Sequence, residues 1–208
     1  HVHLLRAQRG DLRDQAIFDF SFPKAEIRFA PPTPWETALT QTLAGLWRAW
    51  GGLAQVLFLA SLALAARSRK ELATLTGMFL AGQTAAALLV PLTSWQPAPR
   101  FVEAAAALTI AYLAVEILLL PEAGSRWAVA GVLGAFHGLY FDLFLRTSGY
   151  RAAFVMAGAA LGDLLLVAIF ALLFRRIAKA AAALRPVQVS ASLLLVVGMT
   201  WFFMRLID

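Results

Sequence analysis

Hydrophobic residues fill most of this chain in stretches that are too long for strands and too continuous for the surface helices of a soluble domain. Segments that hold Pro, Gly, Arg or Lys separate these stretches. About 20 apolar residues in a helix cross a hydrocarbon core of about 30 Å. The pattern therefore predicts six transmembrane helices, over residues 43–66, 72–94, 101–120, 127–145, 152–174 and 189–206.

The chain before the first apolar stretch has a different pattern. Phe alternates with Asp and Ser over residues 18–22, and a second alternating run covers 26–29. Such alternation is typical of strands and predicts a small β-hairpin outside the bilayer. A helix should begin after it, because Thr33 and Glu36 have capping-box spacing and Pro34 occupies the first helical position.

Composition agrees with this reading. The chain is 61% hydrophobic and 14% charged, whereas soluble domains are about half apolar and about a quarter charged. The predicted fold is an all-α integral membrane protein: a short extracytoplasmic hairpin segment at 1–40, then a six-transmembrane-helix bundle at 41–208. Cysteine is absent, which excludes disulfides and thiolate metal sites. The chain begins at His1 without an initiator Met, so any signal peptide is expected to have been removed.

Basic residues lie between the apolar stretches and form no continuous patch, so the net charge of +6 indicates membrane topology and not a nucleic-acid partner. They concentrate after the first and fifth predicted spans, and these two loops should be cytoplasmic. Both termini are then predicted to be extracytoplasmic. The residues concerned are Arg67, Arg69, Lys70, Arg175, Arg176, Lys179 and Arg185.

Ionisable side chains inside the predicted spans each need a partner, a cavity or a function, since burying one in lipid costs a few kcal/mol. Arg48 and Glu103 fit interfacial placement, where long side chains reach water. Glu116 is either functional or near enough to the end of its span to reach cytoplasmic water. Asp163 lies in the middle of an apolar run, which favours a function or a polar partner inside the bundle.

His137 is flanked by Gly134 and Gly138, which permit close helix approach, so its ring should face a neighbouring helix. It is either a buried histidine held by a hydrogen bond, or a metal ligand or proton relay. Asp142 lies about 140° around the same helix, too far round to chelate an ion with it. The step from Gly158 to Gly162, just before Asp163, predicts tight helix packing.

The stretch 136–141, Phe-His-Gly-Leu-Tyr-Phe, resembles the histidine-glycine motif of the HupE/UreJ family of bacterial membrane proteins. Residues 102–116, 158–162 and 198–205 support the resemblance, which covers about residues 40–207. Members of this family are associated with hydrogenase and urease operons and are regarded as nickel or cobalt permeases. The resemblance implies a bacterial inner-membrane location.

The chain departs from the family pattern where metal ligands are expected. Arg48, Ala54 and Gln55 stand at the likely ligand positions of the first helix, and Gly82 stands at a histidine position of the second. In the fifth helix the family's glutamate position is Ala160. Because a nickel or cobalt path needs several converging donors, the resemblance implies a member that keeps the fold and has lost most of its ligands.

Two functions follow. The first is a non-catalytic accessory or assembly subunit without a cofactor, which packs against other integral membrane subunits through its small-residue faces. The alternative is a permease for nickel, cobalt or another small solute. No enzyme is predicted, because no nucleophile-base pair or metal-ligand motif is present. The candidate metal residues inside the membrane are His137, Asp163, Glu116 and Glu103. A free amino terminus at His1 with His3 would be a separate site for copper or nickel, unless this end is only a loosely ordered polar segment.

Overall fold

The computed structural model describes residues 3–18, 32–120, 125–180 and 186–207. The chain divides into two compact units, His1–Leu39 and Thr40–Asp208, and each is described by itself.

The first unit contains a β-hairpin of strands β1 (His3–Arg9) and β2 (Leu12–Phe18). The strands are antiparallel, and Arg9 pairs with Leu12 across a two-residue turn. Gly10 in this turn has a φ of 64°, a conformation that glycine adopts without strain. The hairpin therefore lies earlier than expected, because the turn residues specify it more strongly than the alternation does. Apart from Phe18, the predicted strands at 18–22 and 26–29 lie outside the described residues.

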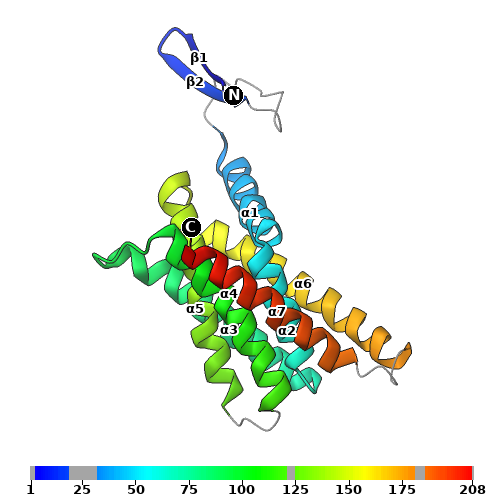
Figure 1. Cartoon of the computed structure of the whole chain (residues 1–208). Coiled ribbons are helices and arrows are strands. Elements are labelled where there is room, and N and C mark those ends of the chain that lie inside the picture. The colour runs from blue at the N-terminus through cyan, green and yellow to red at the C-terminus, as the bar shows by residue number, and fades with distance from the viewer. Residues whose placement is uncertain (1–2, 19–31, 121–124, 181–185, 208) are drawn as a thin grey trace. The chain divides into compact units, whose positions relative to one another are not determined.

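The remaining described elements are helical (Figure 1). They are α1 (Pro34–Gly51), α2 (Leu53–Ala65), α3 (Arg69–Leu89), the 3₁₀ turn η1 (Val90–Leu92), α4 (Pro99–Leu119), α5 (Arg126–Ser148), α6 (Ala152–Ala180) and α7 (Pro186–Ile207). Among the described residues, five helices are long and apolar enough to cross a membrane, and the count is six if α1 and α2 form one bent span. The chain is an all-α, multi-pass membrane protein, as predicted.

The first predicted span is bent. α1 and α2 meet at an angle of 73°, so the expectation of one continuous helix over 43–66 is wrong. The break falls at Gly52, whose extended backbone (φ −80°, ψ 97°) lies between the two helices. Glycine is a poor helix former, and its missing side chain provides nothing to hold the helix straight. The predicted start of α1 is confirmed, because the Glu36 amide donates to Thr33 Oγ1 at 3.2 Å and the Thr33 amide donates to Glu36 Oε2 at 2.9 Å.

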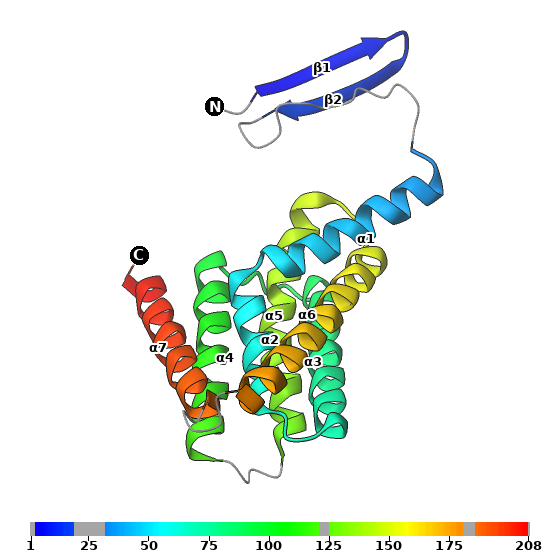
Figure 2. The ribbon, with the colours of Figure 1, turned by 90° about the vertical axis from the view of Figure 1, so that its right-hand side faces the viewer.

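The helices of the second unit pack in pairs. α3 lies along α5, α7 lies along α4, and Figure 2 shows α2 between α4 and α6. Glycines bring α3 and α5 together, because Gly82 faces the backbone of Gly131 and Gly134 faces the backbone of Phe79. Hydrocarbon provides no hydrophobic drive for helix association, so this close backbone contact supplies much of the packing energy.

The predicted small-residue step on α6 does pack tightly, and its partner is α1 of the same chain. Gly158 lies against the backbone of Thr42. Gly162 accepts a hydrogen bond at its carbonyl from Trp50 Nε1 at 3.1 Å. Because α1 covers these glycines, they are not available as a surface for another subunit.

Replacing Gly82 with alanine should destabilise the fold, whereas the same change at Gly77 in the same helix should not. A Cβ at position 82 would meet the Gly131 carbonyl, but nothing lies within 4 Å of a Cβ at position 77. Overpacking costs about 1–3 kcal/mol, while alanine at an open helical position gains up to about 1 kcal/mol. Thermal unfolding of the purified variants in detergent measures the difference, and equal melting temperatures would contradict the close contact of α3 with α5.

Candidate functional site

His137 points into the bundle from α5. Its side chain is 1% exposed, and its ring centroid lies 4.6 Å from that of Phe58 on α2 and 5.6 Å from that of Phe79 on α3. The prediction of an inward-facing imidazole is confirmed. The ring has a polar donor and a polar acceptor that hydrocarbon cannot satisfy, so it needs partners inside the protein.

Both ring nitrogens of His137 have such partners. Nδ1 lies 2.8 Å from Gln55 Oε1, and Nε2 lies 3.0 Å from Thr109 Oγ1. An amide oxygen only accepts, so Nδ1 carries the proton and donates it to Gln55. The Thr109 hydroxyl lies against Nε2, but its single hydrogen is donated to the Ala106 carbonyl at 2.6 Å, which can only accept. A metal ion at Nε2 would have to displace this hydroxyl.

Asp163 continues this polar chain on α6. Its side chain is fully buried, and its Oδ1 accepts a hydrogen bond from Gln55 Nε2 at 2.8 Å. Gln55 on α2 therefore uses both ends of its amide, one toward His137 and one toward Asp163. The polar partner that the sequence analysis expected for Asp163 is an uncharged amide.

Glu116 belongs to a different cluster, at the C-terminal end of α4. It is 3% exposed, so the alternative in which it reaches water is wrong. Its Oε1 lies 2.7 Å from Nε of Arg126, which stands at the start of α5. Arg126 also lies 3.4 Å from Glu71 and donates to the Ala65 carbonyl at 3.2 Å. This arginine ties together the ends of α2, α3, α4 and α5, which is a structural role.

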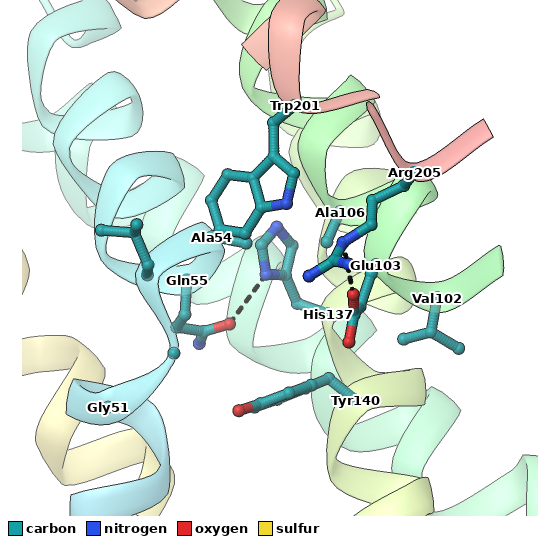
Figure 3. A pocket seen from close by; sticks show the side chains of 12 residues that line it. Gly51, Ala54, Gln55, Val102, Glu103, Ala106, His137, Tyr140, Trp201 and Arg205 are labelled. Carbon is teal, nitrogen blue, oxygen red and sulfur yellow. Dashed lines mark hydrogen bonds and ion pairs between the residues drawn. The ribbon is translucent and has the colours of Figure 1, made fainter. Parts of the chain in front are cut away.

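A cavity of about 270 Å³ lies beside His137, between the α1–α2 bend, α4, α5 and α7. Figure 3 shows the His137 ring and the Glu103–Arg205 pair on different helices around this space. Its polar and aromatic lining consists of Gln55, Glu103, His137, Tyr140, Trp201 and Arg205. Two of the four predicted metal residues, His137 and Glu103, thus line one cavity.

Charges at this cavity are already paired or stacked. Glu103 on α4 forms an ion pair with Arg205 on α7, with 2.7 Å between Oε2 and Nε. The guanidinium of Arg48 lies 3.8 Å from the ring centroid of Tyr140, in cation–π geometry. Arg48 therefore packs on Tyr140, an aromatic residue that lines the cavity.

Comparison with protein families identifies the family of the chain. A family model described as HupE / UreJ protein matches residues 24–206, nearly the whole chain. The chain belongs to the HupE/UreJ family. The predicted family membership is thereby confirmed, and the family connects the chain with nickel or cobalt handling at a membrane. Neither a curated protein nor a solved structure matches the chain.

Within this HupE/UreJ fold the four predicted metal residues do not converge. In the described ranges, no group of three or more His, Cys, Asp or Glu side chains is arranged to hold a metal ion. His137 and Glu103 share the cavity, Asp163 is joined to His137 through Gln55, and Glu116 pairs elsewhere. His1 lies outside the described residues and His3 lies in β1, so the terminal copper or nickel site remains a prediction.

Sequence reasoning missed several residues that build this site. Gln55 and Thr109 hold the imidazole. From the sequence, Gln55 was identified only as a departure from the family pattern, and Thr109 was not identified. A glutamine in the middle of an apolar run was the available signal for Gln55, because an amide at bilayer depth also needs partners. Nothing local pointed to Arg126, whose partners come from three other helices.

Replacing Gln55 with leucine should destabilise the protein, because it leaves His137 Nδ1–H and Asp163 Oδ1 without their partner. Each unsatisfied buried group costs about 1–3 kcal/mol. Gln188→Leu is the matched control, because Gln188 lies exposed on α7. Thermal unfolding in detergent should show a lower melting temperature for Q55L alone. A Q55L variant as stable as Q188L would argue against the hydrogen-bonded chain.

Proposed function

We propose that this HupE/UreJ-family protein does not transport nickel or cobalt, and that it is a non-catalytic accessory or assembly subunit of a membrane protein complex. The observation that carries the proposal is the hydrogen bonding of His137, whose two ring nitrogens are taken by Gln55 and Thr109. An ion would have to displace Thr109, and it would gain a single imidazole in exchange.

Coordination chemistry supports this proposal. Nickel and cobalt give up firmly held water only to several converging nitrogen or oxygen donors. Here Glu103 and Glu116 already neutralise arginines at 2.7 Å, so recruiting either carboxylate would leave a guanidinium without its partner. Arg48, stacked on the ring of the cavity residue Tyr140, adds a positive charge nearby, which opposes entry of a cation.

The surface for another subunit would be on α7. This helix packs mainly against α4. Only 17% of its 18-residue apolar stretch is buried inside the protein, compared with 56% of the corresponding stretch of α4. Most of α7 therefore faces lipid or a neighbouring protein. This differs from the glycine steps on α6, which α1 covers.

A permease for a divalent metal or another small solute is the second candidate function. One observation favours it, because His137 and Glu103 line the same cavity and that cavity adjoins the bend at Gly52. Bent helices with irregular backbone are typical of sites that line a path through a transporter. In this alternative the Glu103–Arg205 pair would have to open.

Metal binding separates the two functions. The full chain with His1→Ala and His3→Ala, which removes the candidate terminal site, should bind Ni(II) or Co(II) no tighter than about millimolar, because one imidazole leaves most coordination positions to water. Isothermal titration in detergent measures the affinity, and adding His137→Ala should not change it. Micromolar binding that disappears with His137→Ala would instead support the permease.

Transport provides an independent readout of the same question. Vesicles that contain the purified protein should take up no more nickel or cobalt than empty vesicles. Uptake that requires Asp163 or Glu103, and that is lost in D163N or E103Q, would replace the accessory role with the permease.

The proposed setting is a bacterial inner membrane with both termini outside the cytoplasm. Reporter tags at the amino terminus and after Asp208 should both report an extracytoplasmic location, and a tag within residues 67–70 should report a cytoplasmic one, because basic loops stay inside. The result depends on α1 and α2 crossing the membrane as one bent span. Termini on opposite faces would show that this pair does not cross.

A further inference from the structure

A second cavity, of about 200 Å³, lies where α2 ends, α3 begins, α6 ends and α7 begins. It is lined by two arginines, Arg67 and Arg175, by Ser68, and by an apolar wall that includes Leu64, Phe174 and Val187. Its residues are separate from those of the His137 cavity.

The polar side of this cavity is positively charged, and its hydrogen-bond donors are available to a ligand. Arg67 and Arg175 are exposed, and within the described part of the chain neither guanidinium forms an ion pair. The nearest acid in sequence, Glu71, accepts from the Arg67 backbone amide at 2.8 Å and lies 3.4 Å from Arg126. Ser68 caps α3 by accepting from the Glu71 amide, so its own hydroxyl hydrogen remains available.

The position of the two arginines matches the interface of a bilayer. Arg67 lies two residues after the end of α2, and Arg175 comes about 23 residues into α6, which at 1.5 Å per residue is roughly the thickness of the hydrocarbon core. Both spans run in the same direction through the membrane, because three crossings, α3, α4 and α5, lie between them. The arginines therefore lie at headgroup depth on one side, whichever side that is.

The apolar wall specifies the kind of anion. Leu64 and Phe174 extend the cavity from the arginines toward hydrocarbon depth, and the α6 surface next to it, at Leu172 and Leu173, is 62% and 46% exposed. A free inorganic anion would use only the arginines. A lipid with an anionic headgroup would use both halves, with its phosphate at the guanidiniums and an acyl chain along the apolar wall.

We propose that this cavity is a binding site for an anionic phospholipid, in which Arg67 and Arg175 hold the phosphate and the wall formed by Leu64, Phe174 and Val187 holds the start of an acyl chain. The site does not depend on whether the protein is an accessory subunit or a permease. It would fix lipid at the junction of four helices, where α6 meets α7.

The chain offers a matched control for the test. Arg69 and Arg176 stand next to the two proposed ligands, are also exposed, and do not line the cavity. The variant R67Q/R175Q and the variant R69Q/R176Q remove the same charge from neighbouring positions at the same helix ends. A general attraction of the basic loops for anionic lipid would be weakened equally by both.

Native mass spectrometry of the full chain in neutral detergent, with phosphatidylglycerol or phosphatidylcholine of identical acyl chains added, measures the retained lipid. The wild type should retain phosphatidylglycerol preferentially. The R67Q/R175Q variant should lose about fivefold in preference for each arginine, and R69Q/R176Q should keep most of it. Circular dichroism of each variant without lipid checks that it is folded, and R67K/R175K should restore part of the preference because it restores the charge.

Three results would overturn the proposal. Equal losses in the two double variants would mean general attraction to basic loops. No preference in the wild type would mean that no site exists. If glycerol 3-phosphate, the headgroup phosphate without acyl chains, competes with phosphatidylglycerol at similar concentration, the cavity is a site for a free anion and the apolar wall has no part in binding.

Discussion

The structure depends on the rule that a polar group at bilayer depth must find its partner inside the protein, because hydrocarbon offers none. The chain that runs from Thr109 through His137 and Gln55 to Asp163 follows this rule on four different helices, α4, α5, α2 and α6. Each hydrogen bond crosses a helix interface, so the chain fixes the relative positions of the spans.

The other main features bring these four side chains within reach of one another. Glycines let α5 approach α3 closely, and the bend at Gly52 gives α2 a direction of its own, different from that of α1. Arg126 joins the helix ends on one side of the bundle, and the Glu103–Arg205 pair joins α4 to α7 at the cavity. Close packing and satisfied polar groups therefore support each other.

The sequence predicted those features that depend on local pattern. The later spans, the capping box before α1, the tight packing of Gly158 and the inward orientation of His137 all follow from periodicity, spacing or the cost of burying a polar group. The identity of polar partners could not be predicted, because Gln55 and His137 are 82 residues apart and their contact depends on helix packing. The bend at Gly52 was missed because an apolar composition persists through it, and the hairpin was misplaced because its strands alternate poorly.

The hydrogen-bonded chain at His137 also has a fixed direction. From His137 onward the donors point the same way, from Nδ1 to the Gln55 oxygen and from the Gln55 nitrogen to the Asp163 carboxylate. An amide in the middle of such a chain holds its hydrogens and does not pass them on, unlike a water or a second imidazole. A proton that arrived at His137 would therefore stop there, so these side chains orient one another without forming a conducting path between the cavity and Asp163.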